Sequence, residues 1–464
     1  MGFRLFYSFI VSFSFLFTLN FSCASENEQD PKVTLRVHAV GQGNCVSLEV
    51  RRPNIENSEF MLVDIGSTSF VGEAAYRRFQ ANAAAKIQAA TDFPMGLLTP
   101  PKATTRVEIP FSTAKSPDWS EAQEDTEVLA ELKGTAVESF VEEMRKIMKP
   151  NKGIQQTKKV QKEEIKPISV KTVVITHPDK DHYGWLMNLF HHKEDTIEFL
   201  IFGGLPSHYY SQPREQEEFN KWLNNRLKTH SKIFFPAIQY EPLALQTLEN
   251  LLQEILIKER EGKFAPHTFS GALSFTNLAL AKAFDFDERV IISLLTLNPL
   301  HIGDLGNVVR LADDDADDNK DSLVLRVQYG ASSVMLTGDA TQATTRRIKQ
   351  NYKDDINFLK STVLLASHHG SAEHGCNSEE WVKLVEPQYV LISHGHKYGH
   401  PQAQAYENFK KSPHLKTVKF HHVLVGKGLS KDDIHYEGSL HTTSRAIYST
   451  LNSGALTLEL CLQR

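Results

Sequence analysis

The feature that most constrains this chain is an apolar run that ends in a cluster of possible metal ligands. The run Val173–Ile175 predicts a buried strand. Four ligand-type side chains follow it within six residues, namely His177, Asp179, Asp181 and His182. A strand end brings such side chains into one small volume, where bare carboxylates repel unless a cation neutralises them. The cluster therefore predicts a metal site, most simply one for two ions. A polar loop that merely caps a strand is the alternative, and the ligand types and their spacing disfavour it.

Composition sets the broad class of the protein. The chain has 464 residues, of which 41% are hydrophobic and 23% charged, as in ordinary soluble globular proteins. One elaborated domain or two domains are both compatible with this length. The formal net charge of -5 provides no basic field for nucleic acid, so we expect no stable nucleic-acid complex. A phosphate-containing substrate would be held locally, by metal and a few cations. Of the four cysteines, Cys23 lies in the apolar amino-terminal segment, and the other three can form at most one disulfide, which excludes a disulfide-stapled fold. Their spacing matches no zinc ribbon.

The first 25 residues have the pattern of a secretory signal peptide. Arg4 is the only charge before an apolar run from Leu5 to Leu19, and small residues follow it. We expect cleavage after Ala24 or Ser25, which leaves residues 26–464 as the mature hydrolase domain, exported to the periplasm or secreted. An uncleaved membrane anchor and a lipoprotein signal are the alternatives. The protein would contact a membrane only through the leader, if the leader is uncleaved.

Strand-like segments occur in two blocks, separated by stretches with helical spacing. The first block alternates over residues 33–40, 46–50 and 60–66, and continues at 197–202 beyond the ligand cluster. The second block predicts strands near 322–327, 334–339, 363–366 and 389–393. The stretches at about 67–167 and 205–290 are predicted to be largely helical insertions. A helix is also predicted to open at Gly184.

Three of the later strands end in polar side chains of the kinds that bind metals or phosphates. Asp339 ends one strand, the pair His368 and His369 follows the next, and Lys397 and His400 follow the last. Lys397 and His400 are candidate contacts for a phosphate or a leaving group. A tight turn with incidental polar groups is the alternative for that last segment. The sequence leaves open which histidine of the pair would bind metal.

These motifs resemble a known family. The segment from His177 to His182 resembles the His-x-His-x-Asp-His signature of the metallo-β-lactamase fold, with Asp179 where the second His usually stands. An Asp at that position is typical of the branch that resembles the nuclease-like domain of the DNA-uptake competence protein ComEC. Four further motifs of this chain are similar to motifs of the same branch. The further motifs are Val-Gly-Gln-Gly at 40–43 with Val-Asp-x-Gly at 63–66, Asn-x-x-Ser-Leu-Val-Leu at 319–325 with Leu-Thr-Gly-Asp at 336–339, His-His-Gly-Ser at 368–371, and Tyr-Gly-His-Pro at 398–401. The resemblance covers residues 33–66, 172–203 and 319–405.

The resemblance implies an α/β fold, an αββα sandwich with the metals along one edge and the two helical insertions added to it. It implies that Asp339 bridges two divalent metal ions and that Asp64 supports the metal loop by hydrogen bonds. The remaining ligands would be His177, Asp179, Asp181, His182 and one or both of His368 and His369. The wider superfamily has a His some twenty residues before the bridging Asp, where this chain offers Asp317, Asp318 and Asn319. This oxygen-rich ligand set makes manganese as credible as zinc.

The implied activity is that of an exported binuclear metal-dependent hydrolase. A phosphodiesterase that uses a metal-bridging hydroxide fits best, with a nucleic-acid, nucleotide or phosphorylated envelope substrate. Asp181 would orient the hydroxide, and His400 or Lys397 would assist the departing oxygen. A lactone or amide hydrolase is an alternative that Asp179 and the missing third His disfavour. A non-catalytic binding protein that retained the fold is another, which the full ligand set disfavours.

Overall fold

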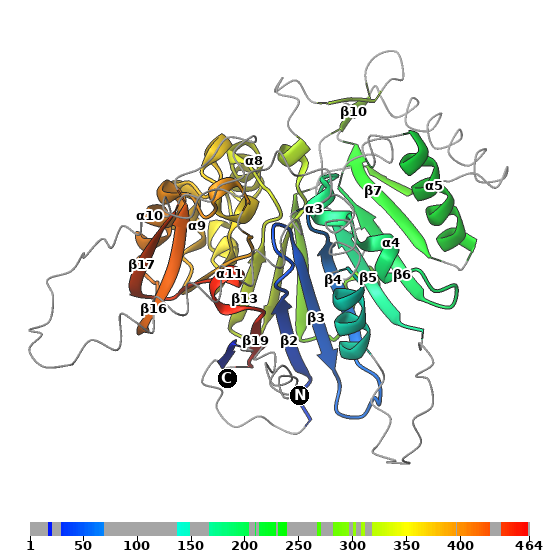
Figure 1. Ribbon diagram of the computed structural model, residues 1–464, viewed down its shortest axis with the longest axis horizontal. Coiled ribbons are helices and arrows are strands. Elements are labelled where there is room, and N and C mark those ends of the chain that lie inside the picture. Colours follow the sequence, from blue (N-terminus) through cyan, green and yellow to red (C-terminus); the bar gives the residue numbers. More distant parts are fainter. Residues whose placement is uncertain are drawn as a thin grey trace, which may run out of the picture.

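The computed structural model describes residues 17–20, 29–68, 137–148, 167–203, 209, 213–228, 231–238, 267–270, 282–296, 300–302, 308–310, 318–395, 397–426 and 438–462. Over these ranges the chain is a mixed α/β protein with two large sheets and a two-stranded ribbon (Figure 1). The ribbon pairs β16 (Thr417–Gly426) with β17 (Gly438–Arg445).

The larger sheet begins as an antiparallel meander and continues as parallel strands. β2, β3 and β4 pair antiparallel, and β4, β5, β6 and β7 pair parallel. The strand order is β1-β19-β2-β3-β4-β5-β6-β7-β10-β11, with β8 beside β7. The predicted strands at 33–40, 46–50, 60–66 and 197–202 are β2, β3, β4 and β6. The bounds are β1 (Phe17–Asn20), β2 (Lys32–Val37), β3 (Cys45–Arg51), β4 (Glu59–Ile65), β5 (Ser169–Ile175), β6 (Thr196–Phe202), β7 (Lys232–Ile238), β8 (His267–Ser270), β10 (Leu300–Ile302), β11 (Val308–Arg310) and β19 (Leu456–Leu460).

The smaller sheet has the order β18-β15-β14-β13-β12-β9. Its strands are β9 (Val290–Thr296), β12 (Val324–Tyr329), β13 (Ser332–Leu336), β14 (Val363–Leu365), β15 (Tyr389–Ile392) and β18 (Ile447–Ser449). β13, β14 and β15 are parallel neighbours, so their carboxyl ends lie at one edge of the sheet. The candidate ligands that follow each of these strands are brought together for that reason.

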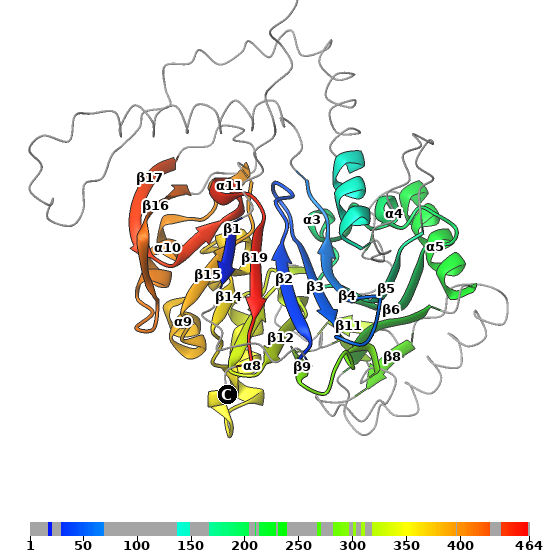
Figure 2. The ribbon, with the colours of Figure 1, turned by 90° about the horizontal axis from the view of Figure 1, so that it is seen from below.

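Helices flank both sheets (Figures 1 and 2). Those near the larger sheet are the helical residues 137–147, α3 (Lys180–Tyr183), α4 (Leu186–Leu189) and α5 (Pro213–Lys228). Those near the smaller sheet are α8 (Gln342–Asn351), α9 (Glu379–Val385) and α10 (Ala403–Lys410), and α11 (Thr450–Ser453) precedes β19. Short 3-10 turns join them: η4 (Asp318–Asp321), η5 (Ile356–Leu359), η6 (Ser367–Gly370), η7 (Glu373–Gly375) and η8 (Lys397–Gly399).

The apolar core has three layers. One lies between the sheets and joins side chains such as Leu35 of β2 and Leu325 of β12. A second packs the outer face of the larger sheet against helical side chains such as Phe219, and the third does the same for the smaller sheet with Trp381. In β5, Val174 belongs to the central layer between the sheets. Val173 and Ile175, on either side of it in the chain, belong to the layer on the outer face of the larger sheet. A strand buried on both faces requires the continuous apolar run that precedes the ligand cluster.

Two expectations about helices need correction. The helix predicted to open at Gly184 begins earlier, as α3 at Lys180, and a second turn, α4, begins at Leu186. The region 205–290 is not simply a helical insertion, because β7 and β8 lie within it and extend the larger sheet. The apolar run Ile233–Phe235 in β7 suits a strand that pairs with β6. Much of the two predicted insertions, including residues 69–136, 149–166 and 239–266, lies outside the described residues, as does Asp317.

The predicted leader overlaps one short strand. β1 falls within residues 1–25 and pairs parallel with β19 at one end of the larger sheet. The rest of the predicted leader lies outside the described residues. No helix in the part of the chain that the structure describes combines the length and apolar character needed to cross a membrane.

Candidate metal centre

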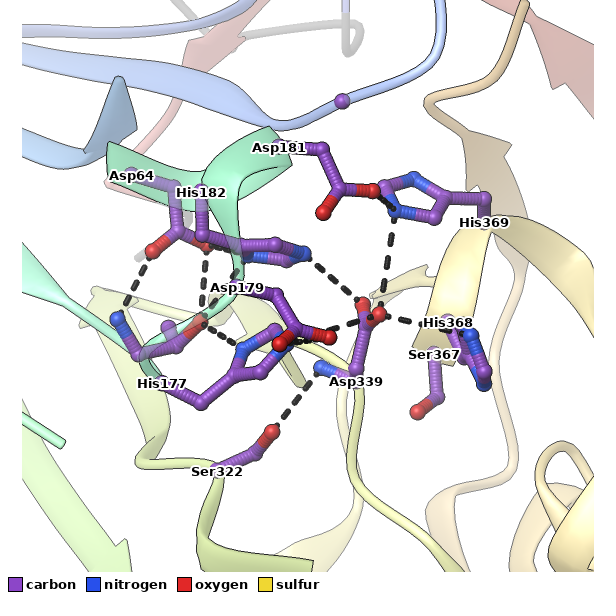
Figure 3. A network of polar contacts seen from close by, with 12 residues as sticks. Asp64, His177, Asp179, Asp181, His182, Ser322, Asp339, Ser367, His368 and His369 are labelled. Atoms are coloured by element: carbon purple, nitrogen blue, oxygen red, sulfur yellow. Dashed lines mark hydrogen bonds and ion pairs between the residues drawn. The ribbon is translucent and has the colours of Figure 1, made fainter. Parts of the chain in front are cut away.

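The ligand cluster occupies the loop between β5 and α3 and the first turn of α3. Figure 3 shows its side chains turned toward one another. Asp179, the residue before α3, has extended backbone (φ -89°, ψ 142°) and makes no side-chain capping bond to the helix. Its carboxylate Oδ2 instead lies 3.6 Å from His177 Nε2. An Asp at this position usually caps the helix, but the side chain of Asp179 faces the ligand cluster instead.

Asp339 enters from the other sheet, just beyond β13. The preceding residue, Gly338, has φ +50°, and a Cβ atom there would lie 2.6 Å from Thr176 Oγ1. Glycine is therefore what allows this turn to approach the end of β5 so closely. The backbone N–H of Asp339 donates to Ser322 Oγ over 3.1 Å, which fixes the direction of the turn. The carboxylate is almost fully buried.

Four imidazole rings converge on this one carboxylate (Figure 3). Oδ1 of Asp339 lies 3.2 Å from His182 Nε2. Oδ2 lies 3.6 Å from His368 Nε2 and 3.7 Å from both His177 Nε2 and His369 Nε2. The structure thus brings together ligands from two sheets that the sequence separates by more than 150 residues. Both members of the His368–His369 pair reach Asp339.

The hydrogen bonds on the far side of the rings determine which nitrogen carries the proton. His182 Nδ1 donates to Asp64 Oδ2 over 2.8 Å, and His369 Nδ1 donates to the Ser393 carbonyl over 2.8 Å. Thr176 Oγ1 donates to Asp64 Oδ2 over 2.9 Å, so it can only accept from His177 Nδ1, which is 3.2 Å away. In the neutral state each of these rings turns an Nε2 lone pair toward the carboxylates.

Lone pairs that face carboxylate oxygens require a positive charge between them. His177 Nε2, His182 Nε2 and Asp339 Oδ1 are buried and have no hydrogen-bond partner among the residues that the structure describes. Two overlapping groups have their ligand atoms within 4.8 Å of one another, namely His177 with His182 and Asp339, and Asp181 with His182 and His369. These residues could hold metal ions. Their mixture of imidazole nitrogen and carboxylate oxygen suits zinc or manganese.

The acid–base properties of the cluster follow from the same geometry. Burial opposes ionisation of Asp339, but the surrounding imidazoles, His182 foremost, outweigh it and hold the pKa of the carboxyl well below its usual range. Burial likewise opposes protonation of His182, yet Asp339 and Asp64 together hold its pKa well above the usual value. The pKa of His369 is raised in the same way, by Asp339 and Asp181 against burial. Protons therefore occupy the cluster when no metal is bound, and a metal ion must displace them.

The His368–His369 pair sits in a strained turn. Their φ angles are 47° and 55°, in the left-handed region that residues other than glycine seldom adopt. Asn377 holds the turn, because its Oδ1 accepts from Ser367 N over 2.9 Å and its Nδ2 donates to the carbonyls of Ser367 and Ser371. Strained backbone of this kind persists only where surrounding contacts impose it, and such positions cluster at functional sites.

The last candidate segment lies beside the cluster. The ring centroid of His400 is 5.8 Å from that of His368 and 6.3 Å from that of His369. Burial, with smaller effects from neighbouring histidines, holds the pKa of His400 well below its usual value, so the ring is neutral at ordinary pH. Lys397 belongs to η8, but its side chain is outside what the structure describes.

Three residues that support this site were missed at the sequence level. Thr176 adjoins the ligand cluster, and its small polar side chain gave no sign that it links three other members of the site. Gln42 was visible within its Gly-Gln-Gly turn, and only the fold brings it to His400, 358 positions away. Asn377 carries no sequence signal, because a lone Asn most often marks a turn.

By its fold and its site, the chain is a mixed α/β protein with a buried His/Asp cluster that could bind divalent cations. Two curated proteins are similar to part of it. ComE operon protein 3 of Bacillus subtilis (strain 168) is 32% identical over 148 residues, which are 32% of this chain and 17% of that protein. Competence protein ComA of Neisseria gonorrhoeae is 31% identical over 105 residues, which are 22% of this chain and 14% of that protein.

The matched stretches thus span less than a fifth of either of these two proteins. No protein-family model matches the chain. The two relatives support the resemblance to the ComEC-like family.

Proposed function

We propose that this chain is a binuclear metal-dependent phosphodiesterase built on the αββα sandwich of the metallo-β-lactamase fold. The layer order supports that fold, because two sheets share a central apolar layer and each packs helices against its outer face. The position of the cluster supports it as well, since the ligands follow strands whose carboxyl ends meet at one edge.

One observation carries the proposal. In their neutral state His177, His182 and His369 all turn Nε2 lone pairs toward carboxylate oxygens, because Nδ1 of each ring donates a hydrogen bond on the far side. Acceptors that face acceptors need a positive charge between them, which protons on Nε2 supply when no metal is bound and cations supply in their place. Such an arrangement, at the carboxyl ends of parallel strands, suits a ligand set for cations.

Bound divalent cations would supply a water of lowered pKa and would neutralise the phosphoryl oxygens. The residues of the chain have separate tasks. Asp339 presents Oδ1 and Oδ2 to different imidazoles and so can serve both cations. Asp181, whose Oδ2 lies 3.1 Å from His369 Nε2, orients the attacking water by accepting a hydrogen bond from it. His400 acts at the departing oxygen, and Lys397 offers a positive charge for the phosphate.

The relatives favour a phosphodiester of nucleic acid or a nucleotide as substrate. One of them is named a competence protein and the other a ComE operon protein, which suggests a role connected with DNA uptake. The net charge of -5 argues against a long, stably bound duplex, so we favour single strands or short products held at the metal site. A phosphorylated envelope polymer is the second candidate, and the exported location proposed below favours it.

We also propose that the protein acts outside the cytoplasm. The support is the leader pattern of residues 1–25, with its single charge before a long apolar run. Cleavage after Ala24 or Ser25 would remove β1 and leave β19 as the edge of the larger sheet. Amino-terminal sequencing of protein recovered from the periplasm or medium tests this, and an intact Met1 would contradict it.

The activity is tested with three substrates after chelation and resupply of zinc or manganese: bis-p-nitrophenyl phosphate, single-stranded DNA and the lactam nitrocefin. We expect metal-dependent turnover of the phosphodiesters only. Asp339→Asn should abolish it, whereas Glu198→Gln, a matched change on the exposed face of β6, should not. Turnover of nitrocefin alone would favour the lactone or amide hydrolase. Metal binding without any turnover would favour a binding protein.

A further inference from the structure

We propose that Gln42 holds His400 in the tautomer that carries its proton on Nε2, so that His400 donates a hydrogen bond to the departing oxygen of the substrate. Gln42 is then a positioning residue, which acts on the reaction through His400. This inference rests on the proposed phosphodiesterase activity for its consequence, but the tautomer itself can be tested without any turnover.

The orientation of the Gln42 side-chain amide is fixed by its hydrogen bond to the backbone. Its Oε1 accepts from the backbone N–H of Gly395 over 3.3 Å. A backbone N–H can only donate, so the amide oxygen must face Gly395 and the NH2 group must face the other way. That group, Nε2, lies 3.4 Å from His400 Nδ1. Because an amide nitrogen only donates, Nδ1 of the neutral ring accepts this bond, and the ring proton lies on Nε2.

The turn that carries Gln42 is fixed to the end of the opposite sheet. A Cβ atom on Gly395 would lie 2.5 Å from Gln42 N, so the two backbones are in close contact. Ser393 Oγ donates to the Gly43 carbonyl over 2.8 Å, and Ser67 Oγ donates to the Gln42 carbonyl over 2.9 Å. Gln42 is fully buried. The amide therefore has no solvent into which to turn, and its orientation is imposed on His400.

The resulting tautomer is opposite to that of the candidate metal ligands. In the neutral, metal-binding state His182 and His369 carry their protons on Nδ1 and turn Nε2 lone pairs toward carboxylates. The ring of His400 is stacked near His369, with an interplanar angle of 18°, yet its hydrogen bond leaves Nε2 as a donor. A ring with Nε2–H cannot ligate a cation through that atom, but it can donate to an oxygen that gains negative charge as the P–O bond breaks.

Gln42→Glu tests the assignment because it changes an amide donor into an acceptor of the same size. The carboxylate can still accept from Gly395 N, and its second oxygen would accept from His400 Nδ1, which moves the ring proton to that atom. Nitrogen-15 NMR of the zinc-loaded protein, with labelled histidine, distinguishes the two tautomers. His400→Gln assigns the resonance.

We expect an Nε2–H signature for His400 in the native chain and an Nδ1–H signature in Gln42→Glu. An Nδ1–H signature in the native chain would overturn the assignment, as would a tautomer that ignores the substitution. If Gln42→Glu fails to fold, Gln42→Met replaces it. We then expect a mixture of tautomers, because methionine supplies no hydrogen-bond donor, and a pure Nε2–H ring would overturn the assignment.

The consequence for catalysis is measured with two substrates that differ in their leaving group. The dinucleotide TpT expels an alkoxide, which needs a proton, whereas bis-p-nitrophenyl phosphate expels a stable phenolate. We expect Gln42→Glu to lower kcat on TpT by about 100-fold and on the nitrophenyl ester by no more than a few-fold. Adding His400→Gln should cause no further selective loss.

Equal losses on both substrates would overturn the leaving-group role. A native chain inactive on both would refute the proposed function, while NMR still decides the tautomer.

Discussion

His182 Nδ1 donates a hydrogen bond to Asp64 Oδ2 over 2.8 Å, although the two residues lie 118 positions apart in the chain. The same carboxylate accepts from Thr176 N over 2.7 Å and from Thr176 Oγ1 over 2.9 Å. Asp64 therefore anchors the start of the ligand loop and sets the ring of one ligand at its far end. Its own φ of 58° is unusual for a residue with a side chain. Through Asp64, strand β4 thus supports the candidate ligand loop that follows the neighbouring strand β5.

Removing the charge of Asp64 should weaken metal binding without removing a ligand. In Asp64→Asn the amide offers one acceptor where the native residue receives three hydrogen bonds, so the ring of His182 loses its fixed orientation. Changes to such outer partners typically lower metal affinity by about 10–100-fold. Competition with a chromophoric zinc chelator measures the affinity, with Glu198→Gln as the control. Unchanged affinity in Asp64→Asn would mean that its carboxylate does not support the ligand loop.

Metal binding should release protons. The pKa values of His182 and His369 are raised in the metal-free site, chiefly because Asp339 outweighs the effect of burial. Both rings therefore hold their second proton to higher pH than an ordinary histidine, His182 most strongly, and a metal ion has to displace those protons. Zinc affinity should rise as the pH increases from 6 to 8. Isothermal titration calorimetry in buffers of different ionisation enthalpy should report net proton release, and a value of zero would contradict this account.

The metal-free protein should lose stability in acid through Asp181. Burial opposes ionisation of this carboxyl, but the hydrogen bond from His369 and the nearby positive rings outweigh it and lower its pKa to about 2. A depressed pKa in the folded state means that the stabilisation is complete above about pH 4 and is lost as the pH falls toward 2. The loss should be on the order of 2 kcal/mol. Urea unfolding of chelated protein measures it, and Asp181→Asn should flatten the curve across that window.

Asn377 should prove essential to the turn that carries His368 and His369. Asn377→Ala leaves Ser367 N and two carbonyls without their partners, which should cost about 3 kcal/mol of unfolding free energy. Because φ of Asn377 is 53°, strain on the new alanine could contribute to the loss. Asn377→Gly separates the two causes, since glycine relieves strain but also lacks the amide. Glycine should be nearly as damaging as alanine, and a stable glycine variant would show that the amide bonds are dispensable.

The parts of the fold that could be predicted are those with local patterns. The alternation in β2, β3 and β4 and the apolar run before His177 identify strands, because burial on one or both faces leaves a direct trace in sequence. The buried His/Asp cluster could be predicted for the same reason, since its candidate ligands follow apolar runs at several strand ends. Their convergence on Asp339 is set by the parallel order of the strands, and only the resemblance to a known family supplied it beforehand.

The parts that could not be predicted depend on long-range pairing. β19, near the end of the chain, pairs with β2, near its beginning. The five residues of β19 give no local sign of that partner. β7 lies in a region whose composition favours helix, and pairing with β6 decides its state. Gln42 and Asn377 act through hydrogen bonds to loops that only the assembled fold brings near.

The most direct test of the account is the zinc content of the folded protein. We would equilibrate the native chain, Asp339→Asn and Glu198→Gln with buffered zinc, remove free metal and measure bound zinc by mass spectrometry. We expect two zinc ions per chain in the native protein and in Glu198→Gln, and fewer than two in Asp339→Asn, because in the proposed site Asp339 would serve both ions. A native chain that binds no zinc or manganese while folded, or an Asp339→Asn variant that retains both ions, would contradict the central claim.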